Sequence, residues 1–253
     1  MRTLWTALVA VVSTIWHAGR ILIPAAFRSP NFPQVAREQP RSWARSLLWA
    51  AGVKVEMEGL ENLPPGVPAI VVANHESWFD VFALVVHLPV DYRFVGKIEL
   101  TRVPFFGPSW LACGHIAIDR SDRNKAIESL RQAGESLRRE GAVVVMFPEG
   151  TRSEDGSLLP FKKGAFVLAL QTGVPVVPVG VSGSREIMPK GSWRIRPGTI
   201  HVRIGPPIPV EGRGEGAREE LLQEARSEVA RLRQPVLQES VGEDQTRDTE
   251  PDP

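Results

Sequence analysis

Two short apolar runs, each followed at once by polar residues, constrain the fold of this chain most. Residues 68–73 (PAIVVA) and 142–147 (AVVVMF) contain no charge and are rich in β-branched side chains. Uninterrupted runs of this length are typical of strands buried on both faces. Because stretches with helical spacing separate the strand-like runs, the sequence predicts an α/β fold: a single sandwich domain with a largely parallel central sheet flanked by helices.

A third apolar run, residues 174–181 (VPVVPVGV), has prolines at positions 175 and 178. Proline has no N–H to donate to a neighbouring strand. The prolines therefore predict that this strand lies at an edge of the sheet or contains a bulge.

Residues with the chemistry of a base and its orienting partner follow the first run, in the segment 74–80 (NHESWFD). Open α/β sheets usually place their chemistry beyond the carboxyl ends of the strands. Ser77 has the character of a helix N-cap, and Asp80 would then lie in the first turn of that helix. From there its carboxylate can reach one imidazole nitrogen of His75, so that the other nitrogen accepts a proton. No serine or cysteine nucleophile accompanies the pair, so the nucleophile would come from the substrate.

Two other interpretations of the same pair stay open. Asp80 is also the expected acidic residue of a capping box with Ser77, favoured by the helix dipole. His75 and Asp80 could alternatively be two ligands of a metal site, since a short motif of this kind has several uses.

Groups suited to an anion follow two other strand-like runs, at residues 149–152 (EGTR) and at Arg120. Gly150 permits a tight turn whose amides can point at an anion. Arg152 offers a bidentate fork for phosphate, with Arg120 as a second cation, although either could instead be a surface ion-pair partner. If the strands are neighbours, these groups and His75 meet in one crevice.

The net charge of +1 hides an asymmetry along the chain. Residues 235–253 contain six acids and one base, so residues 1–234 carry a net charge of +6. A basic body suits an anionic membrane surface, a phosphorylated substrate or nucleic acid. Nucleic acid is the partner with the least support, because the bases are scattered among acids and no nucleic-acid-binding module is recognised. The single cysteine, Cys113, excludes an internal disulfide framework.

The N-terminal segment is apolar from residue 4 to residue 16, and Arg2 and Arg20 flank it. This run is shorter than the ~20 residues that a membrane-crossing helix needs, and Trp5 and Trp16 favour the membrane interface. A secretory signal peptide is the rival interpretation, but a second apolar stretch follows Arg20. We expect a monotopic anchor that dips into one leaflet, on the cytoplasmic face of the cell membrane.

The predicted organisation has three parts. Residues 1–52 form N-terminal membrane-associated helices, the second of them at residues 41–51, and this second helix could equally pack on the core. Residues 53–234 form the α/β domain. Residues 235–253 form an acidic tail that is too poor in apolar residues to fold.

Four segments in one order resemble the conserved blocks of the phospholipid/glycerol acyltransferase family. They are residues 74–80, 114–120, 147–153 and 174–179. Lys97, in the segment GKIEL, is similar to the family's lysine-x-glutamate-leucine sequence. The resemblance covers about residues 50 to 210 and leaves the N-terminal helices outside it.

The resemblance implies transfer of an acyl chain from acyl-CoA or acyl-carrier protein to the free hydroxyl of a lysophospholipid, lysophosphatidic acid, with no metal or organic cofactor. His75 would take the hydroxyl proton, Asp80 would hold His75, and Lys97 would stabilise the oxyanion or the acyl donor. The substrate-binding residues implied by the resemblance are Asn74, Lys97, Arg120, Glu149, Gly150, Thr151 and Arg152.

Two alternatives to this activity are kept. The acceptor could be a lyso-ornithine lipid, another lysophospholipid or glycerol 3-phosphate. The chain could also be a non-catalytic lipid-binding relative, although the intact pair of His75 and Asp80 argues against that.

Overall fold

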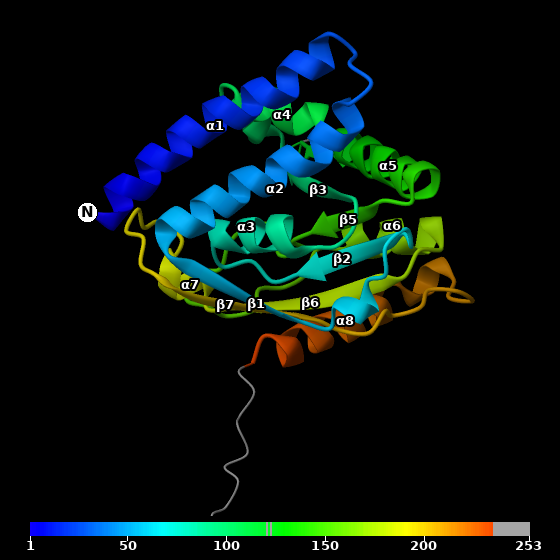
Figure 1. Ribbon diagram of the computed structural model, residues 1–253. Coiled ribbons are helices and arrows are strands. Elements are labelled where there is room, and N and C mark those ends of the chain that lie inside the picture. Colours follow the sequence, from blue (N-terminus) through cyan, green and yellow to red (C-terminus); the bar gives the residue numbers. More distant parts are fainter. Residues whose placement is uncertain (120, 122, 235–253) are drawn as a thin grey trace, which may run out of the picture.

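Seven strands form one sheet at the centre of the protein. The computed structural model describes residues 1–119, 121 and 123–234 (Figure 1). The strands are β1 (Val53–Glu58), β2 (Ala69–Ala73), β3 (Tyr92–Lys97), β4 (Ile116–Ile118), β5 (Val143–Met146), β6 (Val176–Ser182) and β7 (Gly198–Ile204). Their order is β1-β7-β6-β2-β5-β3-β4, and only the β6–β7 pairing is antiparallel. The predicted largely parallel sheet is confirmed, with β1 and β7 running opposite to the other strands.

Helices cover both faces of this sheet (Figure 1). The α-helices are α1 (Arg2–Ala26), α2 (Phe32–Ala51), α3 (Trp78–His87), α4 (Phe106–Ala112), α5 (Arg123–Glu140), α6 (Gly164–Thr172), α7 (Ser184–Ile187) and α8 (Arg218–Leu232). Short 3-10 helices occupy Leu60–Asn62, Ile98–Arg102 and Glu215–Ala217. Helices α2, α3, α4 and α7 pack on one face and α5, α6 and α8 on the other. Helix α1 lies outside α2, farthest from the sheet.

The apolar runs are explained by two cores that share the strands. On β2 and β5, Val71 and Val145 point into the core beneath α2 and α3. Their sequence neighbours Ile70 and Val144 point into the core beneath α5, α6 and α8. Since every position of these strands is buried, polar residues are confined to the positions after the strands end.

The expectation that the proline-containing strand lies at an edge is wrong. Strand β6 is internal, between β7 and β2. Its antiparallel pairing with β7 begins at Val179, opposite Ile204, so Pro178 stands just before that ladder. The carbonyl of Pro178 still accepts a hydrogen bond from the N–H of Gly205, at 2.9 Å. The proline is therefore tolerated in an internal strand, because it lies where the pairing of β6 with β7 stops.

Helix α1 extends well beyond the apolar run of residues 4–16, and α2 is longer than the sequence predicted. Helix α1 has 25 residues and, by length and composition only, is long and apolar enough to cross a membrane. Helix α2 begins at Phe32 instead of residue 41, because one proline stands in its first turn and Pro40 is accommodated inside it. A polar side chain of α1 is satisfied by α2: His17 Nδ1 lies 2.8 Å from Gln39 Oε1.

The outer side of α1 is apolar and exposed. Two further bonds fix its inner side, from Trp43 Nε1 to Thr14 Oγ1 and from Arg2 to the carbonyl of Ala51. The exposed apolar side chains of α1 are Leu4, Trp5, Leu8, Val11, Val12, Ile15, Trp16 and Ile23. A face of this kind on a helix with polar contacts on its other side is typical of a surface that meets lipid.

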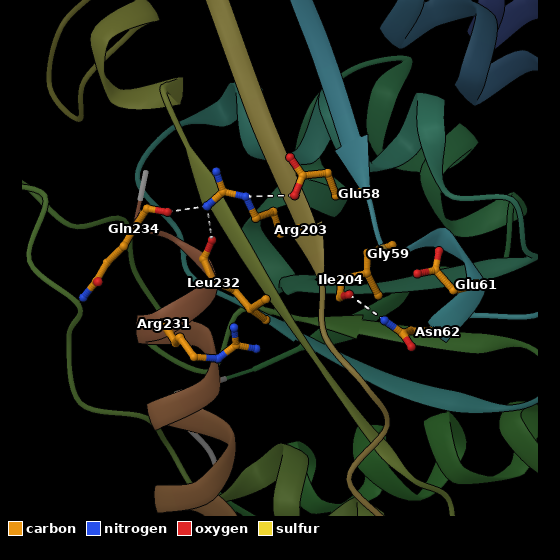
Figure 2. A pocket seen from close by; sticks show the side chains of 9 residues that line it. All are labelled: Glu58, Gly59, Glu61, Asn62, Arg203, Ile204, Arg231, Leu232 and Gln234. Atoms are coloured by element: carbon orange, nitrogen blue, oxygen red, sulfur yellow. Dashed lines mark hydrogen bonds and ion pairs between the residues drawn. The ribbon is translucent and has the colours of Figure 1, made fainter. Parts of the chain in front are cut away.

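A cavity of about 500 Å³ lies where β1 and β7 end beside the last turn of α8 (Figure 2). Arg203 spans it, with an ion pair to Glu58 at 3.2 Å and hydrogen bonds to the carbonyls of Leu232 and Gln234. Its guanidinium thus satisfies carbonyls at the end of α8 that have no partner within the helix. None of the residues that the sequence predicts for the active site lines this cavity.

Gly180 allows the end of α8 to approach the sheet closely. A Cβ at this position would lie 2.4 Å from the backbone of Leu232 and of Arg233. We expect Gly180→Ala to lower the free energy of unfolding by about 1–3 kcal/mol, because strand and helix must separate. Chemical denaturation measures this. Gly216→Ala is the matched control, since a Cβ there meets nothing within 4 Å, and an equal loss in both variants would contradict the prediction.

Candidate active site

The loops that follow β2 and β5 lie side by side, as the sequence predicted from their strand ends. The two strands pair in parallel. The imidazole of His75 stacks on the ring of Phe147, with centroids 4.1 Å apart and planes 19° apart. The N–H of Ser153 donates to the carbonyl of His75 at 2.8 Å. The two motif segments therefore form one polar edge of the sheet.

One oxygen of Asp80 both caps α3 and holds His75. Its Oδ2 accepts from the N–H groups of Glu76 and Ser77, at 2.7 and 2.8 Å, and lies 2.8 Å from His75 Nδ1. Ser77 completes a capping box with its own hydroxyl. The sequence left two roles for Asp80 as alternatives, capping of a helix and orientation of His75. The same carboxylate has both roles. Because Nδ1 donates to that carboxylate, the lone pair of the ring is at Nε2.

The sequence also allowed His75 and Asp80 to be ligands of a metal ion, which would need at least one further ligand nearby. Among residues 1–119, 121 and 123–234, no three His, Cys, Asp or Glu side chains gather closely enough to hold a metal ion.

Arg152 places an unpaired positive charge beside this pair. Its guanidinium carbon lies 5.2 Å from the ring centroid of Trp78, in the first turn of α3. Burial lowers the pKa of Arg152, and the charge of Asp80 opposes that shift. Within the described part of the chain, its guanidinium makes no ion pair or hydrogen bond. A half-buried cation without a counterion is a site for an anionic group of a ligand.

Gly150 turns the chain next to Arg152, and a second cation rests against it. Its φ of +75° favours glycine. A Cβ there would lie 2.8 Å from Lys162 Nζ, while the N–H of Lys162 donates to the carbonyl of Pro148. Thr151 is exposed beside the turn. Lys162 is not among the residues predicted from the sequence, although the Phe161-Lys162-Lys163-Gly164 segment was a basic signal close to the motif.

Asn74 and Glu149, two predicted substrate-binding residues, are buried and hold the site together. The amide of Asn74 exchanges two hydrogen bonds with the backbone of Val181, at 2.7 and 2.8 Å. The carboxylate of Glu149 accepts from the N–H groups of His75 and Leu159, at 2.7 and 2.9 Å. Burial raises the pKa of Glu149 to about 7. Their contact with substrate stays a prediction.

Lys97, another predicted residue, is less closely tied to His75. Lys97 is exposed at the end of β3, the strand on the other side of β5, and so lies at the same edge of the sheet. No hydrogen bond or ion pair recorded for the described residues joins it to His75. Arg120 lies outside the described residues.

A buried ion pair beneath the site was not predicted. Glu76 Oε1 lies 2.7 Å from the guanidinium of Arg233, just after α8, and accepts from the amide of Asn74 at 3.2 Å. Arg233 also donates to the carbonyl of Gly156. Burial raises the pKa of Glu76 to about 7, and the charge of Arg233 only partly offsets this. No local signal marks the pair, because 157 positions separate its members.

Comparison with known proteins places this geometry in a family. The model of the Acyltransferase family matches residues 54–182. The chain belongs to the Acyltransferase family. A 1-acyl-sn-glycerol-3-phosphate acyltransferase of Pseudomonas aeruginosa is 37% identical over 211 residues, which cover 81% of this chain and 80% of that protein.

A chloroplast protein of the same name from Brassica napus is 41% identical over 180 residues, which cover 70% of this chain and 50% of that protein. The chain thus spans about half the length of this plant relative. The crystal structure of the 1-acyl-sn-glycerophosphate (LPA) acyltransferase PlsC from Thermotoga maritima superposes with a TM-score of 0.78 at 28% identity, covering 92% of this chain and 95% of that one. The fold and the four segments that resembled the family are therefore those of acyltransferases.

The buried carboxyl of Glu76 should make the stability of the protein depend on pH. Its pKa rises from 4.5 to about 7 on folding, so the folded state binds the proton more tightly than the unfolded chain does. The free energy of unfolding should therefore fall as pH rises from about 4.5 to 7. Glu76→Gln keeps an oxygen for Arg233 and Asn74 and should remove up to about 3 kcal/mol of that fall.

Urea denaturation at a series of pH values measures this contribution. Arg233→Gln is the paired variant: it leaves the charge of Glu76 without its partner, which raises the pKa of Glu76 further and should extend the fall to higher pH. If Glu76→Gln kept the full pH dependence of the wild type, the carboxyl would not be the titrating group.

Proposed function

We propose that this protein is a 1-acylglycerol-3-phosphate O-acyltransferase, which transfers a fatty acyl chain from an acyl thioester to the free hydroxyl of lysophosphatidic acid and so makes phosphatidic acid. The observation that carries the proposal is an imidazole held by Asp80 through Nδ1, beside the unpaired guanidinium of Arg152. The printed names of the relatives and of the Thermotoga maritima structure support the same reaction.

His75 acts as the general base. Its Nε2 takes the proton from the acceptor hydroxyl while that oxygen bonds to the thioester carbonyl carbon. The tetrahedral oxyanion then collapses, the carbon–sulfur bond breaks, and the leaving thiolate takes the proton from the imidazolium. Asp80 stabilises the charged ring between these two transfers. Lys97, at the same edge of the sheet, is proposed to stabilise the oxyanion or the acyl donor.

The acceptor phosphate binds at the turn after β5. Arg152 supplies the fork of donors, and Lys162 against Gly150 supplies a second positive charge. Thr151 is exposed at the same turn, and its hydroxyl can donate a hydrogen bond to the phosphate. We further propose Asn74, Glu149 and Arg120 as members of the acceptor site, as the family resemblance implies.

Membrane association completes the proposal, since acceptor and product are bilayer lipids. Residues 1–52 would anchor the α/β domain of residues 53–234 through the exposed apolar side of α1. The arginines at its ends suit an anionic, cytoplasmic surface, on which the helix would lie without crossing. Acyl-CoA or acyl-carrier protein would deliver the acyl chain.

The base assignment is tested by His75→Ala. Acyl transfer from acyl-CoA to lysophosphatidic acid should fall at least about a hundredfold, because general base catalysis contributes 10²–10⁴ in rate. Thiol release measures the rate, and circular dichroism and vesicle binding show whether the variant still folds and binds lipid. His201→Ala removes a partly exposed histidine of β7 as the control. Activity close to wild type in the His75 variant would end the assignment.

The phosphate assignment is tested by Arg152→Ala with two acceptors. For lysophosphatidic acid we expect kcat/KM to fall about tenfold to a hundredfold, because a hydrogen bond to a charged group is lost. For monoacylglycerol, which lacks the phosphate, the variant should lose little. Arg139→Ala, on the exposed side of α5, controls for net charge. An equal loss with both acceptors would show that Arg152 does not bind the phosphate, and would favour an acceptor without one.

A further inference from the structure

The segment between α7 and β7, residues 188–197, is basic and lies at the same edge of the sheet as His75. We call it the α7–β7 loop. It follows the carboxyl end of β6 and contains Lys190, Arg194 and Arg196 but no acid. These three cations have no role in the proposed reaction and are not part of the hydrophobic core.

The loop exposes a tryptophan among its cations. Trp193 is 87% exposed, the most exposed tryptophan among the described residues. Arg194 and Arg196 are exposed, and within residues 1–119, 121 and 123–234 their guanidinium groups have no hydrogen-bond or ion-pair partner. Lys190 is held by Glu154 at 2.9 Å. An exposed indole beside two free arginines is typical of a surface that meets lipid headgroups.

The loop is continuous with the exposed side of the N-terminal helices. The N–H of Ile195 donates to Thr3 Oγ1 at 3.1 Å, so the loop rests on the first turn of α1. There Trp5 of α1 packs edge-to-face with the exposed Trp49 of α2, with centroids 6.1 Å apart. Figure 1 shows the loop, in yellow, beside the start of α1. The loop that carries Trp193 thus lies beside the start of α1, where Trp5 and Trp49 pack together.

The loop is also fixed to the active site. Its first residue, Met188, accepts a hydrogen bond from Ser77 Oγ at 2.8 Å. Ser77 caps the helix that holds Asp80. A contact made by the loop therefore has a defined orientation relative to His75.

We propose that the α7–β7 loop is a second membrane-contact element, which places Trp193 among the headgroups of an anionic phospholipid bilayer and binds their phosphates with Arg194 and Arg196. The inference rests on the membrane association proposed above and adds a contact to it. With α1 and this loop both on the bilayer, the edge of the sheet that carries His75 faces the lipid from which the acceptor comes.

An acidic acyl-carrier protein is the other partner that the cations could bind. The bilayer explains more of the structure. Trp193 is an amphipathic side chain of the type that concentrates at the membrane interface, and the apolar side of α1 begins where the loop touches it.

The test places a fluorophore that senses polarity on the loop. Trp193→Cys is labelled through its thiol; native Cys113 is buried, and burial raises its pKa to about 12, so it takes little label. Matched proteins carry the label at Leu8→Cys on α1 and at Ser227→Cys on α8, across the sheet. Each is mixed with phosphatidylcholine vesicles, with and without phosphatidylglycerol, and separately with acyl-carrier protein.

We expect blue-shifted emission from positions 193 and 8 on vesicles that contain phosphatidylglycerol, and no shift from position 227. A shift at position 8 without one at position 193 overturns the inference and leaves the proposed membrane association standing. No shift at either position overturns both. A shift at position 193 with acyl-carrier protein but not with vesicles overturns the lipid assignment of the loop.

The charge contribution is measured by vesicle sedimentation. Arg194→Gln with Arg196→Gln should weaken partitioning onto phosphatidylglycerol vesicles about fivefold for each cation removed, because each cation near an anionic surface contributes ~1 kcal/mol. Arg139→Gln with Arg231→Gln changes the net charge equally on α5 and α8, which cover the other face of the sheet. Equal weakening in both double variants would mean that net charge, and not the loop, drives binding.

Discussion

The arrangement of the site depends on one carboxylate oxygen, Asp80 Oδ2. Three N–H donors converge on it, two from the backbone at the start of α3 and one from His75. The donors at a helix start have no partner within the helix, so a carboxylate there is favoured before any chemistry is considered. The imidazole of His75 is hydrogen-bonded to a carboxylate that already stabilises the start of α3. Its orientation is therefore as rigid as the beginning of a buried helix.

Buried carboxylates also join the loops around this centre. Glu149 connects the segment after β2 to the segment after β5, and Glu76 connects the segment after β2 to the end of α8. Both are removed from water, which raises the pKa of each to about 7. Groups of this kind are costly to bury unless they are hydrogen-bonded. Here their bonds hold several strand ends in one arrangement, and the half-buried guanidinium of Arg152 is left for a ligand.

The sequence predicted what depends on local pattern. The uninterrupted apolar runs predicted buried parallel strands, and the residues after two of them predicted a shared polar edge with His75, Asp80 and Arg152. It did not predict that β6 is internal, because the position of Pro178 relative to the β7 ladder is a matter of register between distant strands. The ion pair between Glu76 and Arg233 was not predicted for the same reason. Each looks like an ordinary surface charge until the fold brings them 2.7 Å apart.

The contact between Arg233 and Glu76 also sets an order of events during synthesis. Helix α1 is made long before α8, and within residues 1–119, 121 and 123–234 Arg233 is the last residue that bonds to the loop around His75. A domain generally folds as a unit, so its tertiary contacts wait for the segments that complete it. The loop around His75 therefore lacks one of its supports until α8 and Arg233 have emerged. A polypeptide that stops before residue 233 keeps all four motif segments and still lacks the charge that faces Glu76.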